Sequence, residues 1–417
     1  MLIRSEDSYT HMATALKREQ DKAAKIALDP YFYQSELVYR EELHQILFKS
    51  WIYAGHTSQI PKQGDYLTLE LGEDSIIIVR DEEDEIRALA NTCRHRGARV
   101  CELGTGSTRL FACPYHAWVY NLDGSLRAAR HMGEDFDKDN YPLKSLSICV
   151  FDGLIFINAD PQAADLQGPL SNIQSQLGAY QLDNAKIAHQ ETYRIEANWK
   201  LCLENYLECY HCGPAHKSYA ASHTLQDTYD RVQEQVSAML ARAPQVTGVP
   251  GIEQEHLRIY ANAEGFGACV YHGRYGLYDG YVTGSEDGKP VAPLMGHFQD
   301  YDGGVGDFQI GPVSFMLNYP DHCVLYRFLP RGRNACDADI IWFVNKDAEE
   351  GKDYDLDRLI WLWHNTTLED KFIITRNRDG VHSLLFEPGP LQPEFEENLQ
   401  DFIEWYVQTL QQGCEAR

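Results

Sequence analysis

The hydrophobic pattern changes character twice along the chain, which has 417 residues. Over residues 9 to about 48, apolar positions recur at helical spacing among strong helix formers, which predicts a helical arm. Beyond Trp51, short apolar runs such as 66–71 and 75–80 alternate with turn sequences at intervals of roughly 8–12 residues. This pattern continues to about residue 159 and is typical of a small antiparallel sandwich or barrel.

A third pattern begins near Pro161. It predicts helices over 169–181 and 199–210, strands between about 268 and 344, and further helices over 358–378 and 394–412. At roughly 150 residues per domain, a chain of this length forms two or three domains. The sequence therefore predicts an α+β protein with three parts: a helical arm (1–48) that packs on the last domain, an all-β domain (49–165) and an α+β domain (166–417).

The composition is that of a globular protein with excess negative charge. Lysines and arginines number 37 against 62 aspartates and glutamates, so the formal net charge is −25. Such a chain repels phosphate backbones and anionic lipids, which disfavours nucleic-acid and membrane partners, whereas a cationic substrate would suit it. The N-terminus lacks the apolar core of a signal peptide, and no stretch approaches 18 apolar residues. The eleven cysteines, an odd number, predict reduced thiols and a cytoplasmic protein.

Two short motifs in the all-β segment combine cysteine with histidine. Cys93 and His95 form the first motif, and Cys113 and His116 form the second, seventeen residues further on. Two thiolates and two imidazoles hold one type of [2Fe–2S] cluster, with the cysteines on one iron and the histidines on the other. A structural zinc ion could use the same four ligands, although zinc sites more often pair cysteines as C-x₂₋₄-C. Cys101, between the motifs, is interpreted as a buried thiol rather than a ligand.

A second candidate metal site follows residue 198. His211 and His216 are five residues apart, and on a continuous helix their side chains would point about 140° from each other. We expect Gly213-Pro214 to break the helix, so that both imidazoles can converge on one ion. Two histidines with one carboxylate are the ligands of non-haem Fe(II) oxygenases and leave positions open for O₂. The alternative is two ordinary histidines near a helix end.

Both motifs together resemble a known family. The pattern C-x-H, seventeen residues, C-x-x-H, and then N-W-K-x₃-E-N-x₂-E-x-Y-H-x₄-H is similar to the α subunit of Rieske non-haem iron oxygenases, from about Trp51 to Tyr406. The resemblance implies a helix-grip catalytic domain, with a central antiparallel sheet, around mononuclear Fe(II). It also implies an all-β Rieske [2Fe–2S] domain whose cluster ligands are Cys93, His95, Cys113 and His116.

The resemblance assigns roles to further residues of the second site. The family's third iron ligand is an aspartate on a late helix, and the Glu369-Asp370 pair gives Asp370 as that ligand, with Glu369 as the alternative. Glu208 matches an acid that connects an iron-ligand histidine to the cluster of a neighbouring subunit. Asn205 matches a residue that supports it.

The C-x-x-C formed by Cys209 and Cys212 surrounds His211. Because it lies on a predicted helix with a candidate ligand inside it, both cysteines are interpreted as core thiols.

The implied activity is that of a terminal oxygenase, which uses O₂ and electrons to hydroxylate a small organic substrate. No G-x-G-x-x-G follows a strand, so NAD(P)H and flavin must bind a separate reductase. Members of the family are usually homotrimers, and the resemblance implies one here.

The sequence around the two histidines is most similar to the branch of this family that oxidises quaternary ammonium compounds, such as choline, glycine betaine, carnitine and stachydrine. There, hydroxylation of an N-methyl group releases formaldehyde. Aromatic residues make up 12% of the chain, with 25 tyrosines, and aromatic faces can hold a methylated cation. Two alternatives are an aromatic-ring-hydroxylating dioxygenase and a zinc-bearing scaffold without turnover.

Overall fold

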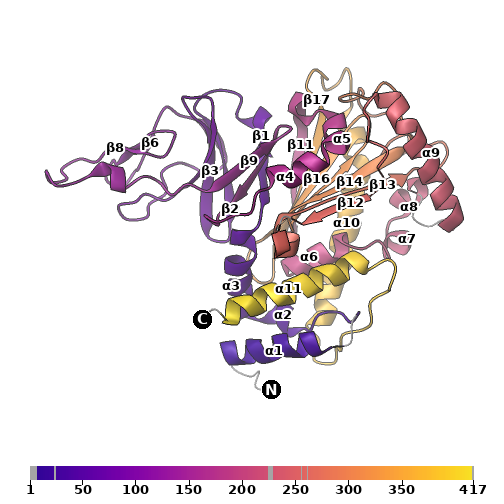
Figure 1. Ribbon diagram of the computed structural model, residues 1–417, viewed down its shortest axis with the longest axis horizontal. Helices are drawn as coiled ribbons and strands as arrows, with labels where there is room; N and C mark the ends of the chain where they lie inside the picture. Colours follow the sequence, from indigo (N-terminus) through magenta and orange to yellow (C-terminus); the bar gives the residue numbers. More distant parts are fainter. Residues whose placement is uncertain (1–6, 23–24, 224–228, 255, 261, 416–417) are drawn as a thin grey trace. The chain divides into compact units, whose positions relative to one another are not determined.

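The computed structural model describes all residues except 1–6, 23–24, 224–228, 255, 261 and 416–417 (Figure 1). The chain forms two compact units, which we describe separately. The smaller unit is Lys49–Ala163, and the larger unit joins Met1–Phe48 to Ala164–Arg417. Strands dominate the first unit, whereas the second combines a large sheet with helices, so the predicted α+β class is confirmed.

The smaller unit is built from three antiparallel sheets, with strand orders β1-β10-β9, β4-β3-β2-β5 and β6-β7-β8. A turn at 122–124 connects β7 to β8, with Gly124 in the left-handed region (φ 89°). The strands are β1 (Ile52–His56), β2 (Asp65–Leu71), β3 (Asp74–Arg80), β4 (Ile86–Ala90), β5 (Thr105–Ser107), β6 (Phe111–Ala112), β7 (Val119–Tyr120), β8 (Leu126–Ala128), β9 (Ser147–Phe151) and β10 (Leu154–Asn158).

The core of the smaller unit lies directly beneath the two cysteine–histidine motifs. Ile77 and Val79 of β3 pack with Phe111, Trp118 and Tyr120, and the side chains of both motif cysteines belong to the same buried cluster. The apolar core therefore fixes the inner ends of both motif loops.

The larger unit is organised around a seven-stranded antiparallel sheet with the order β11-β17-β16-β15-β14-β13-β12. Nearly every residue of β16 and β17 is buried, so both faces of this part of the sheet are covered. The strands are β11 (Ala185–Ile195), β12 (His256–Tyr260), β13 (Cys269–Gly276), β14 (Gly304–Ile310), β15 (Ser314–Asn318), β16 (Cys323–Pro330) and β17 (Cys336–Asn345).

Helices of the larger unit come from both ends and the middle of the chain. The N-terminal helices α1 and α3 contact the C-terminal helix α11, while α10 contacts β11, α6, α7 and α8 (Figure 1). No helix in the described ranges is long and apolar enough to cross a membrane. The helices are α1 (Tyr9–Asp21), α2 (Tyr31–Gln34), α3 (Glu36–Gln45), α4 (Gln167–Asn172), α5 (Gln174–Leu177), α6 (Trp199–Tyr206), α7 (Cys212–Ala215), α8 (Lys217–Ser222), α9 (Tyr229–Thr247), α10 (Leu356–Val381) and α11 (Glu397–Glu415).

The long helix α10 is fixed by its sequence at both its start and its buried face. The Asp355 side chain caps it by accepting a hydrogen bond from the Arg358 backbone N–H. Leu359, Leu362 and Trp363 are at positions i, i+3 and i+4, so they lie on one face of the helix, and all three are buried against the rest of the unit. This packing fixes the axial position and rotation of α10, and hence where residue 370 points.

Candidate metal sites

The two cysteine–histidine motifs lie on loops of the same construction. Each loop closes with a hydrogen bond from a backbone N–H to the carbonyl of the cysteine four residues earlier, at Gly97 and at Ala117. Both residues have positive φ angles, 79° and 54°. Because the chain turns back in this way, the cysteine of each loop points inward while the histidine stays at the surface.

The four motif side chains converge in a way that fits a [2Fe–2S] cluster. The Nδ1 atoms of His95 and His116 are 3.1 Å apart. Two nitrogens bound at about 2.1 Å and roughly 90° on one iron would be separated by about 3 Å. Both cysteines are buried. Burial raises the pKa of the Cys113 thiol, so iron must displace a proton to bind the thiolate.

Neighbouring side chains hold this arrangement in place. The Trp118 ring stacks on the His95 ring at 5.0 Å between centroids. The Tyr120 hydroxyl lies 3.3 Å from Cys93 Sγ and accepts a hydrogen bond from the Arg94 backbone N–H. Such contacts to ligand residues orient the ligands and tune the potential of a bound cluster.

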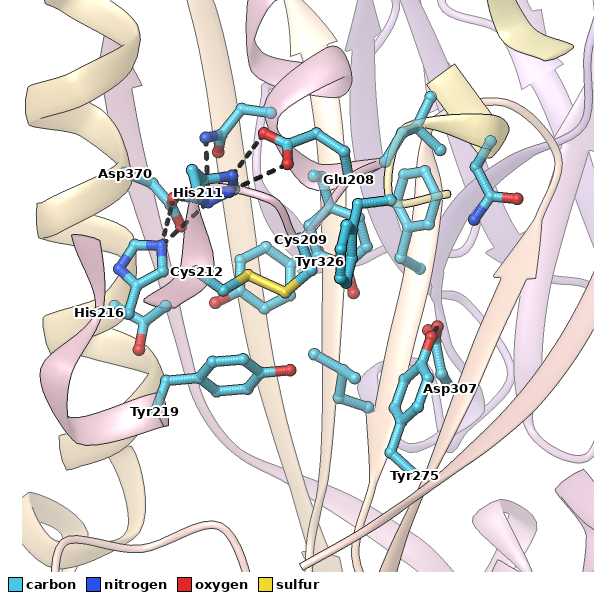
Figure 2. Close-up of a pocket in the computed structure, with 18 of the residues that line it drawn as sticks. Glu208, Cys209, His211, Cys212, His216, Tyr219, Tyr275, Asp307, Tyr326 and Asp370 are labelled. Atoms are coloured by element: carbon cyan, nitrogen blue, oxygen red, sulfur yellow. Dashed lines mark hydrogen bonds and ion pairs between the residues drawn. A yellow bond between two sulfur atoms is a disulfide. The ribbon is translucent and has the colours of Figure 1, made fainter. Parts of the chain in front are cut away.

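In the larger unit, His211, His216 and Asp370 form the group that could hold a single metal ion (Figure 2). The two Nε2 atoms are 3.1 Å apart, and Asp370 Oδ1 lies 3.0 Å from His216 Nε2 and 3.4 Å from His211 Nε2. These separations suit three donors on one face of an ion at about 2.1 Å. Two imidazoles and one carboxylate are the facial donor set of non-haem iron(II) sites.

The prediction that a helix break at Gly213-Pro214 brings the two imidazoles together is wrong. Helix α6 already ends at Tyr206, and the chain turns through residues 207–211. Gly213 and Pro214 do not break a helix but lie within the short helix α7. Proline is tolerated there because the first turn of a helix has no internal acceptors for its N–H groups. His211 precedes α7 and His216 follows it with non-helical backbone angles (φ −117°, ψ 81°), so the chain leaves the helix at His216 itself, and the two Nε2 atoms lie 3.1 Å apart.

Carboxylates orient the far nitrogens of both imidazoles. Glu208 Oε1 lies 2.6 Å from His211 Nδ1, and Glu369 Oε2 lies 2.9 Å from His216 Nδ1. The Asn205 side-chain amide lies 3.3 Å from His211 Nε2. Glu369, the alternative ligand from the sequence, therefore faces the side of His216 opposite to the candidate ion. A carboxylate on the far nitrogen fixes the ring and makes the ligating nitrogen more basic.

The electrostatics of the group favour a cation. Burial alone would lower the pKa of His211, but its hydrogen bonds to Asp370 and Glu208 raise that pKa to about 9. Burial would raise the pKa of Asp370, yet the two imidazoles hold it below its usual value. A site that retains protons on imidazole next to carboxylates is one where a divalent cation can replace those protons.

The cysteines on either side of His211 are not core thiols, as predicted, but a disulfide. Cys209 and Cys212 line the same cavity as the three candidate ligands (Figure 2). The prediction failed because it assumed one helix through this segment. The non-helical turn instead brings the two Cα atoms to 4.9 Å, within the usual range for a disulfide.

A cavity of about 310 Å³ adjoins the candidate ion site. Eight aromatic side chains line its wall, together with carboxylates that include Asp307 of β14, which lies next to Tyr275 of β13 (Figure 2). Asp307 belongs to no recognisable sequence motif, because its position depends on the register of β13 and β14. The aromatic residues are Tyr206, Tyr219, Tyr271, Tyr275, Phe315, Tyr326, Trp363 and Phe395.

Two family descriptions match consecutive parts of the chain. Residues 50–147 match the Rieske [2Fe–2S] domain, and residues 182–412 match the ring hydroxylating alpha subunit (catalytic domain). The second match covers more than half of the chain.

Similar proteins include oxygenase subunits with different named substrates. The chain is 33% identical over 389 residues to the glycine betaine monooxygenase oxygenase subunit of Chromohalobacter salexigens, covering 92% of this chain and 86% of that one. It is 35% identical over 195 residues to the carnitine monooxygenase oxygenase subunit of Escherichia coli K12, covering 46% and 52%. It is also 36% identical over 218 residues to the anthranilate 1,2-dioxygenase large subunit of Acinetobacter baylyi, covering 49% and 45%.

Solved structures share the fold. The quaternary ammonium Rieske monooxygenase CntA in complex with L-carnitine superposes with a TM-score of 0.67 at 22% identity, covering 95% of this chain and 98% of that one. Naphthalene 1,2-dioxygenase from Rhodococcus sp. also gives 0.67, at 20% identity, covering 98% and 99%. The matches in sequence, the shared fold and the two sets of converging donors lead to one conclusion: this chain belongs to the Rieske oxygenase α subunits, enzymes that carry a Rieske [2Fe–2S] cluster and a mononuclear iron.

Proposed function

We propose that this protein is the terminal oxygenase of an oxidative N-demethylation, acting on a quaternary ammonium compound with O₂ and electrons from a separate NAD(P)H-dependent reductase. The observation that carries the proposal is the aromatic cavity beside His211, His216 and Asp370. Aromatic faces attract a methylated cation, which has no proton to donate to an acceptor. The similarity to a glycine betaine monooxygenase oxygenase subunit over 92% of this chain supports the same substrate class.

One oxygen atom of O₂ enters a C–H bond of an N-methyl group, and the other leaves as water after uptake of two electrons and two protons. The N-hydroxymethyl product then breaks its C–N bond, which gives formaldehyde, the tertiary amine and a proton.

We assign the ligands by the geometry of the two sites. His211, His216 and Asp370 would hold the mononuclear iron, and Cys93, His95, Cys113 and His116 would hold the cluster. When bound, the iron supplies oxygen activation and the cluster supplies stored electrons. Glu208 positions the His211 ring from its far nitrogen and would connect it to the path of incoming electrons. Asn205 supports the same imidazole from the cavity side.

A substrate panel tests this function. The holoenzyme, with NADH, O₂ and a flavin–iron–sulfur reductase, should release formaldehyde from at least one of choline, glycine betaine or carnitine. His211→Ala is the matched inactive control, with its cluster absorbance retained. Turnover of aromatic acids alone would contradict the proposal and favour the ring-dioxygenase alternative, to which the similarity covers only about half of the chain.

A homotrimer and a cytoplasmic location stay predictions, as do the domain boundaries at 48/49 and 165/166. Sedimentation velocity of the holoenzyme measures the first of these.

A further inference from the structure

The side chains that line the cavity include several carboxylates. Its wall contains the carboxylates of Glu208, Asp307, Asp370 and Glu394, but neither lysine nor arginine occurs among the described residues that line it. Glu208 and Asp370 are engaged with His211, and Glu394 is at the solvent-exposed rim. Asp307 is therefore the interior carboxylate that the metal site does not use.

The carboxylate of Asp307 is held by a hydrogen bond to one of its two oxygens. Its Oδ2 accepts a hydrogen bond of 2.8 Å from the Tyr275 hydroxyl, and no other partner for its carboxylate is seen in the described part of the chain. Burial raises the pKa of Asp307 to about 6, against the Tyr275 hydrogen bond, so the group is still ionised in neutral solution. A negative charge in an aromatic cavity stabilises a cation there, and it repels an anion.

The aromatic part of the wall can surround a trimethylammonium group. The Tyr206 ring packs against Phe315 and Tyr326, with centroids 4.3 and 5.2 Å apart. Trp363 lies next to Tyr219, at 5.4 Å. These rings belong to α6, β15, β16, α10 and α8, so they approach the cavity from different directions. They recognise the methyl groups and the charge, but they offer nothing to a carboxylate.

A substrate carboxylate would find no lysine or arginine in the described wall, and the imidazoles of His211 and His216 are already paired with carboxylates of the protein. The guanidinium of Arg258 packs 5.5 Å above the Tyr271 ring, but it is bound to Asp401 and Asn398 and does not line the cavity. Gln309 does line it, two residues after Asp307 on the same strand and therefore on the same face. An amide beside a carboxylate suits a hydroxyl better than a second carboxylate.

We propose that the substrate is a quaternary ammonium monocation without a carboxylate, of the choline type, and that Asp307 is the residue that selects it over zwitterionic betaines. This inference rests on the proposed function and specifies its substrate. Glycine betaine and carnitine, which name the similar oxygenases, each carry a carboxylate in addition to the ammonium group.

Choline and glycine betaine form the matched substrate pair, because they share the trimethylammonium group and differ in a hydroxymethyl against a carboxylate. In the holoenzyme, we expect kcat/KM for formaldehyde release to be at least about tenfold higher for choline. Asp307→Asn should lower kcat/KM for choline at least about tenfold, mainly through KM, and should reduce the preference over glycine betaine. Asp307→Glu should restore much of the preference.

Two controls separate charge from folding. Asp300→Asn removes an exposed carboxylate that pairs with Arg242 outside the cavity, and it should change neither parameter. Calorimetric titration of each holoprotein with choline measures binding without turnover, and the cluster absorbance reports folding.

Preference for glycine betaine, or equal losses for both substrates in Asp307→Asn, would overturn the inference while leaving the proposed function intact. A complete lack of formaldehyde from every quaternary ammonium compound would instead refute the proposed function itself.

Discussion

Replacement of Lys200 by methionine should destabilise the larger unit strongly. The Lys200 side chain of α6 is fully buried, and its ammonium group forms an ion pair with Glu42 of α3, which is 1% exposed. The ammonium also donates a hydrogen bond to Asn198 Oδ1 at 2.9 Å and lies about 5.3–5.5 Å from the centres of three aromatic rings. Burial lowers the pKa of Lys200, and Glu42 counteracts this effect.

The magnitude follows from what Lys200→Met leaves behind. The Glu42 carboxylate would keep hydrogen bonds from Trp199 and Tyr406 but lose its counter-ion in a site without water access. Removing one partner of a buried ion pair costs about 3–5 kcal/mol, and the two remaining donors favour the lower end. At about 2–4 °C per kcal/mol for units of this size, the apparent Tm should fall by roughly 6–12 °C.

Thermal denaturation of the holoenzyme, followed by circular dichroism, measures this effect. Lys352→Met is the matched control, because Lys352 is 67% exposed and pairs only at the surface, so its Tm should change by no more than about 2 °C. Glu42→Gln combined with Lys200→Met should recover much of the loss, since no unpaired charge stays buried. Equal Tm values for Lys200→Met and Lys352→Met would refute the reasoning.

Three further predictions concern the candidate metal site. Asp370→Ala should lower the iron content from about three to about two per chain while the cluster absorbance persists; unchanged iron would exclude Asp370 as a ligand. Glu208→Gln should keep both metals but slow single-turnover electron delivery by about 10–100-fold, and a normal rate would exclude its positioning role. In peptide mapping under denaturing conditions, Cys209 and Cys212 should resist alkylation until a reductant is added, whereas alkylation without reductant would show that the disulfide is absent.

The parts of the site that were predictable from sequence are those with short-range ligand spacing. The C-x-H and C-x-x-H motifs lie on two similar loops, and His211 and His216 are close in sequence, so local geometry largely determines where they point. The fold class followed from the change between helical and strand periodicity. Asp370 lies on a separate helix and could be identified only through the family resemblance.

The errors and omissions arise where tertiary structure overrides local pattern. A helix through residues 199–210 was predicted from good helix formers, but α6 ends at Tyr206 so that His211 can reach Asp370. The disulfide follows from that same turn. Asp307 could not be found because only the antiparallel pairing of β13 with β14 places it near Tyr275. The sequence identifies Glu369 only as an alternative ligand to Asp370, since its contact with His216 depends on how α10 packs.

The position of Asp370 on α10 has a mechanical consequence. His216 and Asp370 are far apart in the chain, so an ion bound by both cross-links two distant segments and closes a long loop. Because such an ion binds the folded chain and not the unfolded one, its binding free energy adds to the resistance of the protein to unfolding. Melting temperature should therefore report the loading of this centre in any preparation, independently of turnover.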